Sequence, residues 1–451
     1  MEGEQLCRRQ KSAPAMPSRV GAGKRDTYLQ AARQLDAADP LKEFRKGFHF
    51  PKNSDGSDKL YFCGNSLGLQ HQSVAPAMEE VLAAWRNLAV DGHFAGARPW
   101  LRYHEGLRAG QAAMLGVGAH EIATMNTLTV NLHLAMISFY RPQGSRRRIV
   151  VEQQAFPSDR YAVESQIRLH GLDPAECLVE LAPEDGERLI AEDRIEDYLR
   201  LHGDGVALVL WPGVQYATGQ VFELGRIAAA AQACGASVGF DLAHGIGNLP
   251  LSLKDSGCDF AAWCTYKYLN AGPGSVGGMF IHERHHARQD LPRLNGWFGN
   301  DLATRFRMAP QFSPAPGADA WQLSTHTTLA MAPLMASLEV FAQAGFARLR
   351  EKSVALTAWL AQRVEADLGE EIEIITPLQA ERRGCQLSLR VRAGRDVGRS
   401  LFTYLEQQGV VPDWREPDVI RVAPVPLYNS YEDCARLVRI IRDWADQTHQ
   451  T

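Results

Sequence analysis

The sequence predicts an α/β protein with a large domain, in which a mainly parallel sheet lies between helices, and a smaller α+β domain at the C-terminus. The chain has 451 residues, more than a single domain usually contains. Short, apolar, β-branched runs alternate with helical patterns before about residue 330. After that point two helices precede a mixture of strands and helices, so a second domain is expected.

Four apolar runs in the first part have the length of buried strands, at residues 147–152, 206–211, 237–241 and 277–281. Between them we predict helices at 158–171, with Ser158 as N-cap and Gly171 as C-cap, and around 222–236. Parallel strands need crossover connections, which are usually helices. The alternation therefore predicts a parallel sheet that is covered by helices.

The C-terminal part has its own order of predicted elements. These are helices at 330–345 and 346–368, strands within 371–377 and 385–391, a helix at 395–409, a strand at 419–424 and a last helix that opens with a capping box at Ser430. The predicted division of the chain is a disordered tail (1–26), a segment packing with the small domain (27–60), a large domain (61–325) and a small domain (326–451).

Composition excludes several classes of protein. The net charge of −4 gives no basic footprint for nucleic acid, and no apolar run approaches the length of a membrane span. The polar first 26 residues contain no apolar core of a signal peptide. The eight cysteines are scattered without a C-x-x-C pair, as is typical of reduced thiols. We therefore expect a cytoplasmic protein without nucleic-acid or membrane partners.

Lys267 stands in the stretch WCTYKYLNAGPG (263–274), an apolar and aromatic setting that is unusual for lysine. A desolvated lysine can act as an amine nucleophile, for example as the Schiff-base partner of pyridoxal phosphate. The alternative is a lysine whose stem lies along apolar surface while its ammonium reaches water. This stretch alone favours that alternative.

Three further features favour a cofactor-binding role for Lys267 over the alternative. Asp241 ends a predicted buried strand, where a carboxylate could pair with a pyridinium nitrogen. Phe156 and Asp159 lie between a strand and a helix, where the ring could stack on a flat cofactor. Thr127 and Thr129 stand where a helix begins, a position suited to a phosphate. Each feature has a structural alternative (a turn aspartate, a hydrophobic staple, an N-cap), but together with Lys267 they converge on pyridoxal phosphate.

Two motif matches occur in the wrong context. Residues 272–277 match G-x-G-x-x-G, but a predicted strand follows them where the dinucleotide fingerprint requires a helix. Residues 282–286 match H-E-x-x-H, but they stand where that strand ends and not within a helix. We therefore predict neither a dinucleotide site nor a metal site.

Several long motifs in the right order resemble the kynureninase family, which are pyridoxal-phosphate hydrolases of the aspartate-aminotransferase class (fold type I). The resemblance runs from about Asp26 to Thr448. It is carried by YFCGNSLGLQ (61–70), FPSDRYAVESQ (156–166), VGFDLAHGIGN (238–248), WCTYKYLNAGPG, GWFGND (296–301) and RVAPVPLYNS (421–430).

The resemblance implies a role for each matching residue near the cofactor. Lys267 would bind pyridoxal phosphate covalently, and Tyr266 would contact its phosphate and relay protons. Asp241 would hold the pyridine nitrogen, with His244 nearby and Phe156 over the ring. Further contacts would come from Leu128, Thr129, Pro157, Ser158, Asp159, Pro212, Thr325 and, from a neighbouring subunit of a homodimer, Trp297.

The same resemblance implies the substrate side of the site. Arg421 would clamp an α-carboxylate through its planar fork, and Ser66 and His93 would line the aryl side. For Ser66 a turn hydroxyl and for His93 a polar surface residue are the alternatives. The implied reaction is hydrolytic Cβ–Cγ cleavage of L-kynurenine or 3-hydroxy-L-kynurenine to anthranilate or 3-hydroxyanthranilate and L-alanine, in tryptophan catabolism and NAD biosynthesis. His93 slightly favours the hydroxylated substrate.

The sequence departs from the family pattern at two places. Thr325-His326-Thr327 stands where Asn or Thr followed by two prolines is common, and Pro212 stands where many members carry a hydroxyl. A further substituted kynurenine is therefore an alternative substrate. Three rival functions stay open: aminotransfer or β-elimination, non-catalytic cofactor binding, and serine hydrolysis that uses Ser66 of G-x-S-x-G (64–68) with Asp241 and His244.

Overall fold

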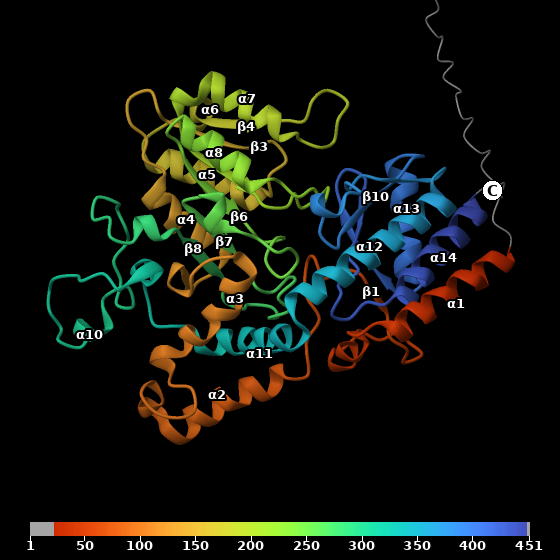
Figure 1. Cartoon of the computed structure of the whole chain (residues 1–451), viewed down its shortest axis with the longest axis horizontal. Helices are drawn as coiled ribbons and strands as arrows, with labels where there is room; N and C mark the ends of the chain where they lie inside the picture. Colours follow the sequence, from red (N-terminus) through yellow and green to blue (C-terminus); the bar gives the residue numbers. More distant parts are fainter. Residues whose placement is uncertain (1–21, 449–451) are drawn as a thin grey trace, which may run out of the picture.

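A computed structural model of the protein describes residues 22–448. A seven-stranded sheet with helices on both faces forms the main part, and a four-stranded sheet with its own helices lies beside it (Figure 1). The predicted tail falls outside the described residues as far as residue 21. Helix α1 (Ala22–Ala38) begins before residue 27, earlier than the predicted end of the tail.

The large sheet is parallel except for one strand, β8, which runs antiparallel to both of its neighbours. The four predicted strands are confirmed, and three others, of three or four residues each, were missed because they are short or lie half exposed at the sheet edge. In spatial order the strands are β2 (Ile122–Thr124), β8 (Gly278–Ile281), β7 (Phe260–Trp263), β6 (Ser237–Asp241), β5 (Val206–Pro212), β3 (Arg148–Glu152) and β4 (Leu178–Leu181).

Helices cover both faces of this sheet (Figure 1). The helices of the main part are α2 (Val74–Leu88), α3 (Arg108–Leu115), α4 (Leu128–Phe139), α5 (Pro157–Leu169), α6 (Pro174–Cys177), α7 (Glu192–His202), α8 (Leu224–Ala233), α9 (Leu253–Ser256), α10 (Leu302–Arg305) and α11 (Thr328–Ala344), of which α2 and α10 lie away from the sheet. Short 3-10 turns are η1 (Lys42–Gly47), η2 (Ala89–His93), η3 (Trp100–Leu107), η4 (Ala119–Glu121), η5 (Gly203–Gly205), η6 (Glu283–His285), η7 (Gly317–Trp321) and η8 (Ala380–Arg382).

The predicted caps of α5 are wrong at both ends. Pro157 takes the first helical position and Phe156 the N-cap, because proline lacks the N–H that would be unpaired there. At the other end His170 is the C-cap, and Gly171 follows it with a φ of +70°. The capping box at Ser430 is confirmed, since its hydroxyl accepts from the Asp433 amide at 3.0 Å and the Asp433 carboxylate accepts from the Ser430 amide at 3.2 Å.

The smaller sheet is antiparallel, in the order β12-β13-β10-β9. Its elements are β9 (Ile372–Ile374), β10 (Leu387–Val391), β12 (Asp413–Arg415), β13 (Val419–Val422), α12 (Phe346–Leu368), α13 (Arg395–Gln407) and α14 (Tyr431–Thr448). Helix α1 packs on α14, and β1 (Leu60–Tyr61) pairs with β11 (Val410–Val411). Helix α11 packs on α2 and η3 of the main part. The domain boundaries at residues 60 and 325 stay predictions.

The described residues contain neither a disulfide bond nor a single helix that could span a membrane. Their seven cysteines are all unpaired. No single helix within residues 22–448 is long and apolar enough to cross a membrane, although α11 and α12, bent by 78°, together meet that length and composition.

Gly239 lies in the middle of β6, where the sheet is closely packed. A Cβ at this position would run into the ring of Phe260 on the neighbouring strand β7. We expect Gly239→Ala to lower the free energy of unfolding by about 1–3 kcal/mol, because the extra methyl overpacks a closed core. Urea unfolding followed by circular dichroism measures this effect. Gly225→Ala, at an exposed position of α8, is the control and should cause no loss, because the nearest neighbour of the added Cβ would be 3.9 Å away. Equal stability of the two variants would contradict the prediction.

Candidate active site

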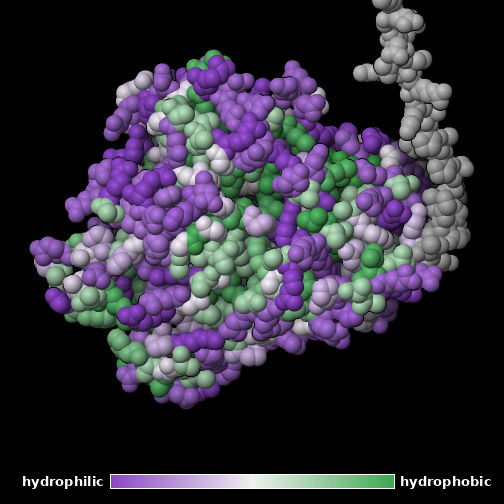
Figure 2. Space-filling view, viewed as in Figure 1, coloured by the Kyte–Doolittle hydropathy of each residue, from purple (hydrophilic) through white to green (hydrophobic). Residues whose placement is uncertain are grey.

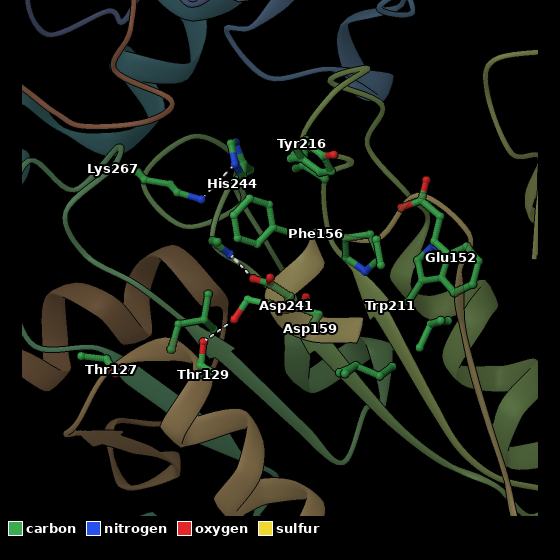
Figure 3. Close-up of a pocket in the computed structure, with 18 of the residues that line it drawn as sticks. Thr127, Thr129, Glu152, Phe156, Asp159, Trp211, Tyr216, Asp241, His244 and Lys267 are labelled. Carbon is green, nitrogen blue, oxygen red and sulfur yellow. Dashed lines mark hydrogen bonds between the residues drawn. The ribbon is translucent and has the colours of Figure 1, made fainter. Parts of the chain in front are cut away.

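A cavity of about 230 Å³ lies at the carboxyl ends of β3, β5 and β6 (Figure 3). The N-termini of α4 and α5 and the segment around Lys267 close its sides. The predicted cofactor residues that line it are Leu128, Thr129, Phe156, Ser158, Asp159, Pro212, Asp241, His244, Tyr266 and Lys267. Most of the predicted constellation is thus in one place, because parallel strands end at the same edge of the sheet.

Lys267 points across this cavity toward His244 (Figure 3). Its Nζ lies 3.0 Å from Nε2 of His244, 5.7 Å from the centroid of the Phe156 ring and 6.0 Å from that of Tyr266. Burial, and next the charge of Lys267, hold the pKa of His244 well below its usual range. A neutral imidazole can accept a hydrogen bond from the lysine amine, so His244 fixes the direction of the Lys267 side chain.

Two buried carboxyl groups stand beside each other on the floor of the cavity (Figure 3). Asp241 Oδ1 accepts a hydrogen bond of 2.7 Å from the amide of Ala243, which orients the side chain. Burial, and next the charge of Asp241, raise the pKa of Asp159 well above its usual value. Oδ1 of Asp159 has no hydrogen-bond partner although it is buried. Such a group calls for a ligand atom, since buried polar atoms are nearly always paired.

The start of α4 forms the other end of the cavity. Thr127 is the N-cap of this 12-residue helix, yet its side chain makes no capping hydrogen bond. The first amides of α4 therefore face the cavity without a side-chain cap, an arrangement suited to a phosphate. The hydroxyls of Thr129 and Ser158, from α4 and α5, lie 2.8 Å apart and add donors at the same end. Burial raises the pKa of Tyr266 well above its usual value, so its hydroxyl is a neutral donor.

Arg421 on β13 lies at the edge of the cavity and is only 1% exposed. Its Nη1 donates to the carbonyl of Tyr216, a cavity-lining residue, at 2.7 Å. Its Nη2 donates to Oγ of Ser66 at 3.0 Å and is paired with Asp413. Burial lowers the pKa of Arg421 to about 10, so the guanidinium remains charged at neutral pH.

The contacts of Ser66 do not fit a serine hydrolase. Its Oγ donates to Asp413 at 2.8 Å and accepts from Arg421 and Arg415, while Nε2 of His244 is bonded to Lys267. No histidine is hydrogen-bonded to Ser66 within residues 22–448, so the nucleophile–base pair that this reaction requires is missing.

Six predicted site residues do not line the cavity of their own chain: Ser66 and Arg421, which lie next to it, and four others. Pro157 opens α5 behind it. His93, the last residue of η2, contacts Phe94 and Trp100, with ring centroids 6.3 and 5.2 Å away. Trp297 and Thr325 lie in two loops elsewhere on the large part. Their roles stay predictions.

The unusual Thr325-His326-Thr327 segment is anchored by its histidine. The ring of His326 lies 3.9 Å from that of His104 and 4.2 Å from that of Phe298, centroid to centroid. Burial lowers the pKa of His326 to about 2. A packed, neutral imidazole thus holds the loop where the family pattern uses rigid prolines, and Thr327 becomes the N-cap of α11.

The two rejected motifs fold as predicted. Residues 272–277 lead into the strand β8 and not into a helix. In the second motif His282 caps η6 through its ring, and Nε2 of His286 bonds the carbonyl of Ile281 at 2.9 Å. Glu283 pairs with Lys254 at the surface. The two histidines therefore do not share one face of an α-helix.

Several residues in the cavity or next to it were missed by sequence reasoning. Glu152 ends β3, so the strand-end argument that found Asp241 also applies to it. Burial raises the pKa of Glu152 to about 8, and both its Oε2 and Nε1 of neighbouring Trp211 lack hydrogen-bond partners. Tyr216 and Asp413 carried no signal of their own, because their positions depend on tertiary contacts of a loop and of an edge strand.

The amino-acid sequence is similar to a family model and to whole proteins along most of their length. A family model described as the kynureninase C-terminal domain matches residues 349–441. A protein named Kynureninase from Xanthomonas campestris pv. campestris is 56% identical over 414 residues, which cover 92% of this chain and 97% of that protein. Another protein of that name, from Stenotrophomonas maltophilia, is 54% identical over 411 residues, covering 91% of this chain and 97% of the relative.

Solved structures share the fold at low sequence identity. A complex of the cystine C-S lyase C-DES with cysteine persulfide superposes with a TM-score of 0.72 at 20% identity, covering 86% of this chain and 98% of that one. Cysteine desulfurase from Thermococcus onnurineus gives the same TM-score at 17% identity, covering 90% and 98%. These neighbours show the fold type I architecture and carry no further conclusion about substrate.

The buried carboxyl of Glu152 makes stability depend on pH. Its pKa is about 8 in the folded protein against 4.5 for an exposed glutamate, so the folded state binds more protons between these values. The free energy of unfolding should therefore fall as pH rises from about 4.5 to 8, by several kcal/mol at about 1.4 kcal/mol for each pH unit. Glu152→Gln should flatten this dependence and raise stability at pH 8.

Urea unfolding at pH 5, 6, 7 and 8 measures the effect. The control is Glu187→Gln in an exposed loop, which should keep the native slope. A slope that is unchanged in Glu152→Gln would show that another group causes the pH dependence.

Proposed function

Because the chain belongs to the kynureninase family, we propose that it hydrolyses the Cβ–Cγ bond of L-kynurenine or 3-hydroxy-L-kynurenine. The products are anthranilate or 3-hydroxyanthranilate and L-alanine, and the cofactor is pyridoxal phosphate. The observation that carries the proposal is the convergence of Lys267, Asp241 and the uncapped start of α4 on one cavity. The relatives' name supports the substrate class, and the pathway is tryptophan catabolism.

The residues of the cavity fit pyridoxal phosphate. The unpartnered, buried Oδ1 of Asp159 and the carboxyl of Asp241 would hold the pyridine nitrogen side of the ring. The free amides of α4 and the hydroxyls of Thr129 and Ser158 would hold the phosphate. Lys267 would provide the amine that binds the cofactor, and Phe156 a flat ring beside it.

Pyridoxal phosphate, when bound, would supply an electron-accepting ring, which stabilises negative charge on the carbon that loses a proton. The chain's own groups then bind and move protons. Arg421 holds the substrate carboxylate with a charge that persists at neutral pH. The amine of Lys267, directed by neutral His244, accepts and returns a proton. The neutral hydroxyl of Tyr266 donates one to the carbon released from the ketone.

We propose that two copies of the chain form the active enzyme. Three exposed aromatic residues, Phe94, Trp297 and Phe306, are connected by ring contacts of 6.0 and 5.8 Å and are 61%, 40% and 49% exposed. Figure 2 shows hydrophobic surface in this region, at the lower left of the molecule. A large exposed apolar patch favours a protein interface. A second copy on this aromatic patch could deliver Trp297, and with it Thr325, to the partner's cavity.

A cytoplasmic location completes the proposal. It is supported by the seven unpaired cysteines of residues 22–448, which are typical of a reducing compartment.

Turnover of the two substrates tests the reaction. Protein loaded with pyridoxal phosphate should form L-alanine and the aromatic acid in equal amounts, and Lys267→Ala should lose at least about a thousandfold in kcat because it removes both the amine and its proton transfers. The ratio of kcat/KM for the two substrates identifies the preferred ring. Bound cofactor without turnover of either compound would refute the proposed substrates and point to a further substituted kynurenine.

Mixing two inactive variants tests the dimer. If Trp297 acts in the partner's site, Lys267→Ala and Trp297→Ala chains are each impaired, but a mixed dimer contains one site with both residues intact. Co-expression should therefore restore activity well above the sum of the separate variants. If Trp297 served its own chain, no mixed site would be complete and no activity would return.

Introducing a charged side chain into the aromatic patch tests whether the patch is the dimer interface. Phe306→Glu should shift the protein from dimer to monomer in sedimentation equilibrium, since it buries a carboxylate in an apolar interface. Leu201→Glu on α7, which is 64% exposed against 49% for Phe306 and lies far from the patch, is the control and should remain dimeric. Monomers in both variants, or in neither, would contradict the proposed interface.

A further inference from the structure

The guanidinium of Arg421 already holds a carboxylate from its own chain. Asp413 on β12 stands directly opposite Arg421 on β13 in the antiparallel register, and the two side chains form an ion pair. Oδ2 of Asp413 also accepts a hydrogen bond of 2.8 Å from Ser66. Asp413 is therefore paired with the same guanidinium that, in the proposed function, binds the substrate carboxylate.

The hydrogen-bond donors of Arg421 show what remains free for a ligand. Nη1 is bonded to the carbonyl of Tyr216, and Nη2 contacts both Ser66 and Asp413. Nε is buried and has no partner. A carboxylate that approaches this side of the planar fork bonds Nε and Nη2 together. One half of this fork is thus open, and the other half is taken by Asp413.

We propose that Asp413 is an exchangeable internal ligand of Arg421, and that the α-carboxylate of the substrate displaces it. The proposal rests on the proposed function, because it takes Arg421 as the substrate clamp. Charge is conserved in the exchange: one carboxylate leaves the guanidinium and another arrives. The exchange therefore never leaves this fully buried charge without a counterion, a state that would be strongly destabilising.

Arg415 provides a place for the displaced side chain. It lies two residues along β12 on the same face, and its Nη2 is 3.1 Å from Oδ2 of Asp413 and 3.3 Å from Oγ of Ser66. The Arg415 side chain is 33% exposed against 1% for Arg421, so its guanidinium can follow Asp413 toward solvent. Strand β12 lies at the edge of its sheet and has only one neighbouring strand to restrain it.

The exchange has a measurable consequence for affinity. An internal ligand lowers the apparent affinity of the substrate by the fraction of time that it leaves the clamp free. Asp413→Asn keeps the size of the side chain but removes its charge, so we expect KM to fall about three- to tenfold while kcat changes less than twofold. If Asp413 instead held Arg421 in its productive orientation, the same substitution would raise KM.

A matched control separates this effect from general damage to the sheet. Asp418, next to β13, is also a buried aspartate that pairs with an arginine, Arg390, at 2.6 Å. Asp418→Asn should leave KM unchanged. A fall in KM in both variants would overturn the assignment, and so would an unchanged or raised KM in Asp413→Asn.

Equilibrium binding adds a readout that does not depend on turnover. Binding of L-alanine and of L-alaninamide is followed through the absorbance of the bound pyridoxal phosphate. Asp413→Asn should tighten L-alanine about three- to tenfold and leave L-alaninamide unchanged, because the amide lacks the carboxylate that competes with Asp413. Equal changes for both ligands would contradict the exchange.

Arg415 is tested in a double-mutant cycle. Arg415→Gln removes the alternative partner of Asp413, so KM should rise, but the same change in an Asp413→Asn background should have no effect. A rise in both backgrounds would mean that Arg415 binds the substrate itself, which would overturn its assigned role. Absence of cofactor binding and turnover in the native protein would refute the proposed function, whereas native turnover without these shifts refutes only the exchange.

Discussion

The parallel pairing of β3, β5 and β6 is the constraint on which the site depends. In the register of the sheet Pro212 stands beside Asp241, and Glu152 ends the strand on the other side of β5. Three parallel strands that stop together leave their last side chains and the helix starts that follow them in one hollow. The carboxyl groups and the start of α4, which is proposed to hold the phosphate, therefore lie together as a consequence of the strand pairing alone.

Bringing several ionisable side chains together in a buried cavity is electrostatically unfavourable when they are charged. In this site most of them are neutral. Burial raises the pKa values of Asp159, Glu152 and Tyr266 and lowers that of His244. Neutral groups can donate or accept hydrogen bonds without the large penalty of an unpaired buried charge. The cavity consequently presents fixed dipoles and few charges to a cofactor. The charged Arg421 lies at its edge, where the carboxylate of Asp413 neutralises the charge.

Local pattern was enough to predict the parts of the structure that lie within single segments. The strand that ends at Asp241, the helix that starts after Thr127 and the embedded Lys267 all follow from runs of a few residues. The antiparallel direction of β8 and the short strand β7 depend on pairing between distant segments, so local pattern does not contain them. Asp413 was missed for the same reason: it becomes a neighbour of Arg421 only when β12 pairs with β13.

The same dependence on distant contacts links the smaller sheet to the cavity. The backbone of residues 216–218 accepts hydrogen bonds from side chains of that part, with Gln386 bonding the carbonyl of Tyr216 at 3.0 Å, Ser388 that of Ala217 at 2.6 Å and Thr376 that of Thr218 at 2.6 Å. Because Arg421 bonds the Tyr216 carbonyl as well, this loop sets the position of the arginine relative to the cavity. All three side chains are buried, so breaking these bonds would leave polar groups unpaired. The spacing between Arg421 and the cavity is therefore fixed by polar contacts within the core, whereas the proposed exchange of carboxylates involves a side chain on an edge strand, which has a single neighbouring strand.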